Sequence, residues 1–190
     1  MEIRTIQSKL ETRDDDTPII EGHFAVFDRE TELFPMTFET IDRSAFNGAL
    51  QDDVRALINH DTTLVLGRNR ARTLELSIDN VGLYGKIIIN TADTDAMNLY
   101  QRVKRGDVSQ CSVGFDIIDE VRDFREDGTA HFLIKKVKLY EVSPCTFPAY
   151  TDTSIEARKM QIAEHSQRAM EAWKHRQKAR LKNGIKTANA

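Results

Sequence analysis

The sequence has little cysteine and no long apolar run. Its 190 residues include two cysteines, Cys111 and Cys145, and a single tryptophan. Two cysteines cannot build a disulfide framework, and no histidines or carboxylates accompany them at the spacing of a metal site. No segment approaches the ~20 apolar residues that a membrane helix needs, and the N-terminus lacks the apolar stretch of a signal peptide. We therefore expect a cytosolic protein whose cysteines pack as small apolar side chains.

The motifs of several common enzyme classes are also missing. The sequence contains no glycine-rich dinucleotide or phosphate loop, no His-Glu-x-x-His zinc motif and no Gly-x-Ser-x-Gly elbow. It predicts no cofactor and no metal. Specific nucleic-acid binding is not favoured, because the body of the chain is acidic and Trp173 is the single aromatic residue within the basic C-terminal segment.

Charge is distributed unevenly along the chain. The net charge is −3, yet residues 155–190 contain nine basic and three acidic side chains and so carry +6. Residues 1–154 must then carry −9. We expect an acidic folded domain over residues 1–153 and a basic helical tail over residues 154–190, capped near Asp152–Ser154 and running to about Lys182.

Alternating apolar and polar residues predict a body made mostly of strands. The expected strands span residues 2–10, 19–27, 34–41, 64–67, 73–79, 83–89, 108–118 and 132–142. Residues 13–18 are expected to form an exposed loop, and Asp42 is suited to cap a short helix over residues 43–50. This pattern predicts an α+β fold, an antiparallel barrel or sandwich with helices packed outside it.

One convincing helix is expected in the body, over residues 91–105. Asp93 or Thr94 can cap its N-terminus. Its apolar residues recur at helical spacing and form one stripe, which consists of Ala96, Leu99, Tyr100 and Val103. Gly106 then suits the left-handed conformation that closes a helix.

The strand that follows this helix carries the first candidate for chemistry. Period-2 alternation places Cys111, Val113, Phe115 and Ile117 on one face and Ser112, Gly114 and Asp116 on the other. The first set is expected in the core. Gly114 leaves space for close approach of other backbone or of a substrate, and Ser112 presents a hydroxyl beside it. As a nucleophile, Ser112 needs a base and an orienting partner from elsewhere in the chain.

Five histidines are candidates for the base. His60 stands at the polar end of the apolar run Leu57–Asp61, and His23 is its rival in the middle of an expected strand. His131 falls in a hairpin arm, and His165 and His175 fall on the basic tail, where exposure is the default.

For the orienting partner, simple alternation groups Val137, Leu139 and Glu141 on one side of the expected return strand. A carboxylate at the end of such an apolar face needs a partner, which an imidazole N–H can supply. Asp61 and Asp116 are alternatives for this role. The residues alone indicate an α+β domain with the composition of a hydrolase site, and they leave these alternatives open.

The order His60, Ser112, Glu141 resembles that of the prohead (capsid maturation) proteases of tailed bacteriophages, which share a fold with the herpesvirus assemblins. The resemblance spans residues 2–153. It is carried by the segments Ile20–Asp28, Ala56–Asp61, Val65–Gly67, Asp79–Leu83, Gly106–Phe115, Leu139–Ser143 and Phe147–Tyr150. One departure is local: the family often has Met-Ser-Phe-Gly-Phe where this chain has Cys111–Phe115.

The resemblance implies a serine endopeptidase with an assemblin-like β-barrel, in which Ser112 is the nucleophile and His60 the general base. The third catalytic member of the assemblins is a second histidine, whereas the matching region here offers Glu141, which can fix the tautomer of the imidazole. Backbone N–H groups, Arg68 or Arg70 are candidates for the oxyanion donors. A nucleophile at Cys111 is disfavoured, because alternation points it away from the face of Ser112.

The resemblance also implies partners. The expected substrates are the major capsid protein, scaffold segments and the chain itself, inside the assembling procapsid in the host cytoplasm, and a homodimer is compatible with this role. The basic tail can dock on acidic scaffold or be removed by self-cleavage; a solvated helix is the alternative. The competing function is a capsid-assembly or scaffold-binding module without enzymatic activity. No membrane partner is expected.

Overall fold

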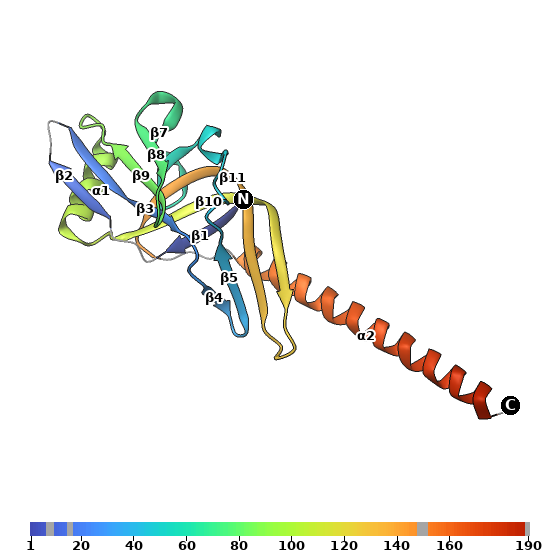
Figure 1. Ribbon diagram of the computed structural model, residues 1–190. Coiled ribbons are helices and arrows are strands. Elements are labelled where there is room, and N and C mark those ends of the chain that lie inside the picture. Colours follow the sequence, from blue (N-terminus) through green and yellow to red (C-terminus); the bar gives the residue numbers. More distant parts are fainter. Residues whose placement is uncertain (7–9, 15–16, 148–151, 189–190) are drawn as a thin grey trace. The chain divides into compact units, whose positions relative to one another are not determined.

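The structure is a computed structural model that describes residues 1–6, 10–14, 17–147 and 152–188. It divides into two compact units, residues 1–151 and 152–190, each considered by itself. The first unit contains eleven strands, two short 3₁₀ helices and one α-helix in its described residues (Figure 1). Their bounds are β1 Glu2–Ile6, β2 Glu11–Asp14, β3 Pro18–Val26, β4 Thr31–Phe34, β5 Thr37–Ile41, η1 Ala49–Gln51, β6 Arg55–Ile58, β7 Asp61–Arg68, η2 Asn69–Ala71, β8 Leu74–Ile78, β9 Gly82–Ile88, α1 Thr94–Arg105, β10 Gln110–Phe124 and β11 Ala130–Cys145.

Two sheets form the framework of this unit. The larger has the order β1-β10-β11-β5-β4, with β6 pairing with both β11 and β7, and the smaller has the order β2-β3-β9-β8. Most pairs are antiparallel, but β11 runs parallel to β5 and to β6. Each described path ends on edge strands, so the sheets are open. The mixture of strands and helices confirms the α+β class. The open sheets do not confirm the predicted barrel.

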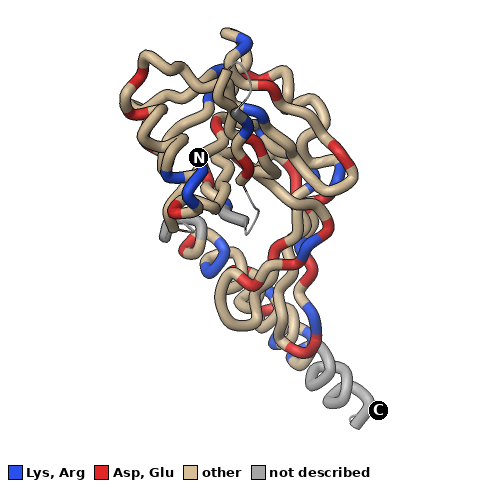
Figure 2. The backbone as a smooth tube through the Cα atoms, turned by 90° about the vertical axis from the view of Figure 1, so that its left-hand side faces the viewer, with Lys and Arg blue, Asp and Glu red and all other residues tan. Residues whose placement is uncertain are grey.

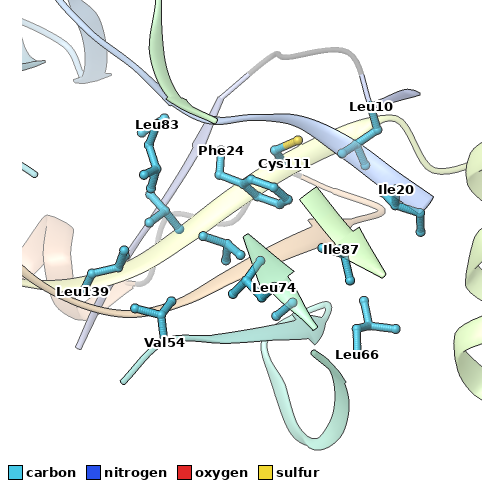
Figure 3. Packing of buried hydrophobic residues seen from close by; sticks show 14 of the residues in the cluster. Leu10, Ile20, Phe24, Val54, Leu66, Leu74, Leu83, Ile87, Cys111 and Leu139 are labelled. Carbon is cyan, nitrogen blue, oxygen red and sulfur yellow. The ribbon is translucent and has the colours of Figure 1, made fainter. Parts of the chain in front are cut away.

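The apolar core contains side chains from both sheets and from α1. Phe24, Leu83 and Cys111 lie within this cluster (Figure 3) and are fully buried. The predicted core face of β10 is confirmed, because Cys111, Val113 and Phe115 are buried in the cluster and Ile117, which is partly buried, packs against it. Burial of this continuous apolar surface supplies the main driving force for folding and holds the strands that carry the polar residues described below.

Helix α1 was predicted over residues 91–105 and spans Thr94–Arg105, so it begins three residues later and ends where predicted. The Asp93 side chain accepts hydrogen bonds from the backbone of Asp95 and Ala96, and Gly106 closes the helix with a φ of 90°. All four residues of the predicted apolar stripe are buried. Because the cap, the stripe and the closing glycine are local signals, the sequence was sufficient to place this helix.

Three local predictions were wrong. The single strand expected over residues 34–41 is the end of β4, a turn at residues 35–36 and the strand β5. The expected helix over residues 43–50 is a series of turns followed by η1, because Gly48 takes a left-handed φ of 88° that interrupts helical geometry. The expected loop at residues 13–18 begins within β2, which pairs with β3 through Arg13↔Ile19. Residues 15–16 of that loop, and residues 148–150 of the expected closing segment, lie outside the described residues.

The second unit consists of helix α2, Asp152–Ala188. It is longer than the predicted tail helix, which was expected to end near Lys182. Three of its large apolar side chains are exposed, namely Met160, Met170 and Trp173. In the first unit, acidic residues are spread over many strands and loops (Figure 2). Among the described residues, no helix has both the length and the apolar character needed to cross a membrane.

Candidate active site

His60 is presented by the tight turn between β6 and β7. Ile58 pairs with Asp61, so Asn59 and His60 form a two-residue connection. Both have positive φ, 49° for Asn59 and 64° for His60, as in the type I′ turns that match the twist of a hairpin. The turn therefore fixes the backbone of His60 in an unusual conformation, and its side chain is 11% exposed.

Glu141 reaches the same place because β11 contains an irregularity. Gly114 lies opposite Glu141, but the next residue of β10, Phe115, lies opposite Leu139, so that Tyr140 is an extra residue in β11. Such a bulge changes the alternation of side chains. Leu139 consequently packs in the core, while Glu141 lies on the face of Gly114 and Ser112. The prediction that Leu139 and Glu141 share one face was wrong.

The carboxylate of Glu141 binds the imidazole of His60. Nδ1 of His60 lies 2.7 Å from Oε1 of Glu141, whose side chain is 3% exposed. Because a carboxylate only accepts hydrogen bonds, Nδ1 carries the proton and Nε2 is left as the basic nitrogen. Nε2 is itself buried and has no hydrogen-bond partner among the described residues. A neutral imidazole held in this tautomer is suited to accept a proton.

Ser112 lies in β10 between β1 and β11 and is fully buried. It faces Ser143 across the β10–β11 pair and Thr5 across the β1–β10 pair. Its hydroxyl donates a hydrogen bond of 2.9 Å to the carbonyl oxygen of Arg4 in β1. The register therefore places Ser112 two positions from Gly114 on the face that also carries Glu141.

A second serine, which the sequence reasoning missed, belongs to the same cluster. Ser143 is fully buried, and its hydroxyl donates to Oε2 of Glu141 at 2.5 Å and accepts from the backbone N–H of His60 at 3.3 Å. The available signal was period-2 alternation, since Ser143 follows Glu141 by two residues. The predicted strand ended at residue 142, whereas β11 continues to Cys145 and so includes Ser143.

The other histidines in the body have different partners. His23 binds Asp79 at 2.8 Å and packs edge-on against Tyr84 in the smaller sheet. His131, near the start of β11, binds Glu30, which lies between β3 and β4, at 2.8 Å. The histidines on α2, His165 and His175, are exposed. Neither His23 nor His131 contacts Glu141 among the described residues, so His60 is the histidine of the first unit that the structure brings to this carboxylate.

The alternative carboxylates also have other partners. Asp61 accepts hydrogen bonds from the backbone and the hydroxyl of Thr63, and Asp116 accepts one from the hydroxyl of Tyr140. Neither contacts His60 among the described residues. The structure therefore selects Glu141 from the three carboxylates considered.

The suggested oxyanion arginines point elsewhere. Arg68 donates to both carboxylate oxygens of Asp53, at 2.7 and 2.5 Å, and Arg70 lies 3.7 Å from the same carboxylate. Hydrogen bonding from Arg68 lowers the pKa of Asp53 to about 2. Both arginines are thus engaged by an acidic residue outside the His60 cluster.

Cys111 has the environment of a packing residue. It is fully buried, on the core face of β10, and is a free thiol. Burial, together with the neighbouring Cys145, raises the pKa of the Cys111 thiol well above its usual range. A thiolate is the reactive form of cysteine, so this environment disfavours Cys111 as a nucleophile.

Comparison with known proteins assigns the family. The family described as caudovirus prohead serine protease matches residues 5–168, which include the His60 turn, β10 and β11. The chain belongs to this family. The match begins in β1 and extends into α2, so membership of the prohead serine proteases rests on most of the chain rather than on one motif.

A curated relative gives the same result. The chain is 28% identical to the prohead protease of Enterobacteria phage HK97 over 166 residues, which cover 85% of this chain and 69% of that protein. No solved structure matches the chain. The comparisons therefore support a prohead serine peptidase, and the resemblance inferred from the sequence is confirmed at the level of the family.

Proposed function

We propose that this chain is the serine endopeptidase of bacteriophage capsid maturation, with Ser112 as nucleophile, His60 as general base and Glu141 as orienting carboxylate. One observation carries the assignment of residues: His60 Nδ1 lies 2.7 Å from Glu141 Oε1, on the face of the sheet that holds Ser112. Base and carboxylate are thus already paired, with Nε2 available for a proton.

The proposed reaction begins with attack of Ser112 Oγ on the carbonyl carbon of a peptide bond. Nε2 of His60 takes the hydroxyl proton as the C–O bond forms, and the resulting imidazolium returns that proton to the leaving amine as the C–N bond breaks. Water then enters and gives a proton to Nε2. The hydroxide attacks the acyl-enzyme, and release of the acid product returns the proton to Ser112.

Glu141 acts through His60 in this scheme. Its carboxylate holds the imidazole in the tautomer that is protonated on Nδ1, and it stabilises the positive charge of the imidazolium. Burial of the pair strengthens both effects because water does not compete for the hydrogen bonds.

The Ser112 hydroxyl must change its partner before it reacts. In this structure its proton is directed to the carbonyl of Arg4 rather than to His60. Hydrogen bonds of catalytic residues are often longer or differently aligned before substrate binds. Attack therefore requires the Ser112 hydroxyl to turn from β1 towards Nε2 of His60, a step that substrate binding can drive.

The proposed substrates are the major capsid protein and scaffold segments inside the assembling procapsid, together with the chain itself. The family and the name of the HK97 relative support this setting. The basic tail, residues 154–190, is proposed either to dock on acidic scaffold or to be removed by self-cleavage, and a homodimer remains compatible with both. The assemblin-like barrel also stays a prediction from the resemblance.

A fluorophosphonate probe tests the assignment without knowledge of the cleavage sequence. We expect the wild-type chain to be labelled on Ser112, and labelling to be lost in Ser112→Ala and reduced by orders of magnitude in His60→Ala. Glu141→Gln, which keeps the shape but removes the charge, should slow labelling by about 10²- to 10⁴-fold. Ser77→Ala, an exposed serine in β8, is the matched control and should react at the wild-type rate.

Expression of the same variants gives a second readout. Wild type is expected to cut a co-expressed major capsid protein, and to truncate itself, whereas Ser112→Ala stays intact on a gel. If wild type and Ser112→Ala both leave the capsid protein and themselves full-length, and neither reacts with the probe, the protease assignment fails. The binding-module alternative would then stand, provided that the intact chain still associates with capsid or scaffold protein.

A further inference from the structure

The buried hydroxyl of Ser143 connects two parts of the candidate site. Ser143 donates to Oε2 of Glu141 at 2.5 Å, and it accepts from the backbone N–H of His60 at 3.3 Å. Oε1 of the same carboxylate accepts from the His60 imidazole at 2.7 Å. The three residues therefore form a closed ring of hydrogen bonds, in which each carboxylate oxygen of Glu141 has its own donor.

We propose that Ser143 is a positioning residue for the catalytic pair. By binding Oε2, it holds the plane of the carboxylate so that Oε1 faces Nδ1 of His60. By accepting from the His60 backbone, it also fixes the turn that presents the imidazole. This inference rests on the proposed function, since it assigns a role to Ser143 through His60 and Glu141.

The surrounding contacts show why the turn needs such a link. Asn59 and His60 both have positive φ, a conformation that costs free energy for residues other than glycine. The end of β11 holds this turn by two further hydrogen bonds, from Asn59 N–H to the Pro144 carbonyl at 3.1 Å and from Thr146 N–H to Oδ1 of Asn59 at 2.9 Å. Ser143 joins the backbone of this turn to the carboxylate of Glu141.

Position also argues against a simple packing role. Ser143 lies directly opposite Ser112, two positions along the strands from the Gly114–Glu141 pair and on the same face. The buried hydroxyl donates its proton to a carboxylate and accepts from an amide, and its loss leaves both groups without that partner. Groups that orient catalytic or metal-binding side chains typically change activity by 10- to 100-fold when they are removed.

The test compares Ser143→Ala with Ser143→Cys, which retains most of the side-chain volume but forms only weak hydrogen bonds. Both are expected to slow the maximal rate of fluorophosphonate labelling by about 10- to 100-fold, with little change in the concentration of probe at half-saturation. Ser44→Ala serves as a control, because its hydroxyl binds Asp42 outside this cluster. If Ser143→Ala does not fold, Ser143→Cys carries the comparison.

A nitrogen-proton NMR spectrum of His60 separates this proposal from the protease assignment. In the wild type we expect a downfield Nδ1–H resonance, protected by the bond to Glu141, and in Ser143→Ala we expect it to broaden or exchange faster. This readout does not require activity, so it tests Ser143 even if no variant reacts with the probe.

Two outcomes overturn the proposal. One is wild-type labelling together with an unchanged Nδ1–H resonance in Ser143→Ala and Ser143→Cys, which leaves the hydroxyl with a packing role. The other is loss of all labelling in Ser143→Ala while Ser112→Ala still reacts, because Ser143 would then be the nucleophile itself.

Discussion

Gly114 shows how a single missing side chain makes room for the catalytic pair. A Cβ added at this position would stand 2.3 Å from Oε1 of Glu141 and 3.0 Å from its Cγ and Cδ. Real carbon atoms do not approach so closely, so any larger residue must displace the carboxylate that binds His60. The sequence led us to expect that Gly114 leaves space for other backbone or for a substrate; the occupant is instead the Glu141 side chain of the neighbouring strand β11.

We expect Gly114→Ala to slow fluorophosphonate labelling and also to lower the free energy of unfolding. Displacement of Oε1 breaks the 2.7 Å bond to His60, so fluorophosphonate labelling should slow at least about 10-fold, with a destabilisation of about 1–3 kcal/mol from overpacking. The measurements are the labelling rate and the free energy of unfolding in urea.

Gly85→Ala is the matched control for this prediction. Its Cβ would meet the ring of Phe24 at 2.6 Å, so it overpacks a strand of the other sheet without contacting Glu141. We expect a comparable loss of stability and near wild-type labelling of the folded fraction. Equal labelling rates for the two alanine variants would show that the contact at Gly114 has no effect on the site.

At the scale of elements, the β10–β11 hairpin explains what the sequence could and could not predict. Both strands were expected, as were Ser112 and Glu141 as partners of a histidine. The extra residue Tyr140 was not expected, because a bulge depends on the pairing of two strands rather than on the composition of either one. The backbone N–H of Leu139, next to the bulge, donates to Asp52 at 2.9 Å, a contact 87 residues distant in sequence.

Asn59 provides a test of the turn as an element. Asn59→Ala removes the acceptor for Thr146 N–H and places a less tolerant residue at a φ of 49°. We expect it to destabilise the protein by about 1–2 kcal/mol and to slow labelling, since the turn carries His60. Asn59→Gly, which adopts this φ freely, should lose less stability.

Asn59→Asp completes this comparison because it preserves an oxygen acceptor for Thr146. Its stability should fall closest to that of the wild type, as measured by thermal unfolding. A ranking in which Asn59→Ala is as stable as Asn59→Gly and Asn59→Asp would mean that neither the backbone conformation nor the side-chain bond contributes to holding the turn.

The loop after β5 predicts a dependence of stability on pH. Asp42 accepts hydrogen bonds from Lys135 Nζ at 2.7 Å and from Ser44, and these contacts lower the pKa of its carboxyl from 3.8 to about 2. The ionised form is favoured in the folded state. Its contribution is therefore complete above pH ~3.8, the unfolded value, and is lost as the pH falls towards 2.

Asp42→Asn should remove this contribution. A shift of this size corresponds to about 2 kcal/mol at neutral pH, and less where water screens the pair. We expect the variant to unfold in less urea at pH 7 and to lose less stability than the wild type between pH 4 and pH 2. Parallel stability curves for both proteins across that interval would contradict a role for Asp42.

At the scale of the whole molecule, local signals predicted elements and tertiary contacts selected the site. Helix α1 and the core face of β10 follow from residues close in sequence, so they could be predicted. The pairing of His60 with Glu141 joins residues 81 positions apart, and the sequence offered three carboxylates for it. The role of Ser143 likewise depends on the contact between the β6–β7 turn and β11. A pattern of residues that are close in sequence cannot predict this contact.

A buried ion pair ties the first strand of the chain into this arrangement. Arg4 of β1 binds Glu39 of β5, across the two strands that separate them in the sheet, and both side chains are 4% exposed. One guanidinium–carboxylate contact, from Nη2 to Oε2, measures 2.9 Å. Despite the opposing effect of burial, bonding to Glu39 and Glu2 raises the pKa of Arg4 above its ordinary value. The carbonyl of this same Arg4 accepts the Ser112 hydroxyl.

Removal of one partner should therefore affect the fold and the environment of Ser112 together. We expect Arg4→Met to cost about 3–5 kcal/mol in urea unfolding, because it removes the cation that compensates the buried Glu39 carboxylate. Glu39→Gln should cost less, because Glu2 still binds the guanidinium of Arg4. The double variant Arg4→Met with Glu39→Leu should regain much of that loss, since an apolar pair of similar volume needs no compensation. Additive losses in the double variant would show instead that the two side chains act independently and that β1 is held by its backbone pairing with β10.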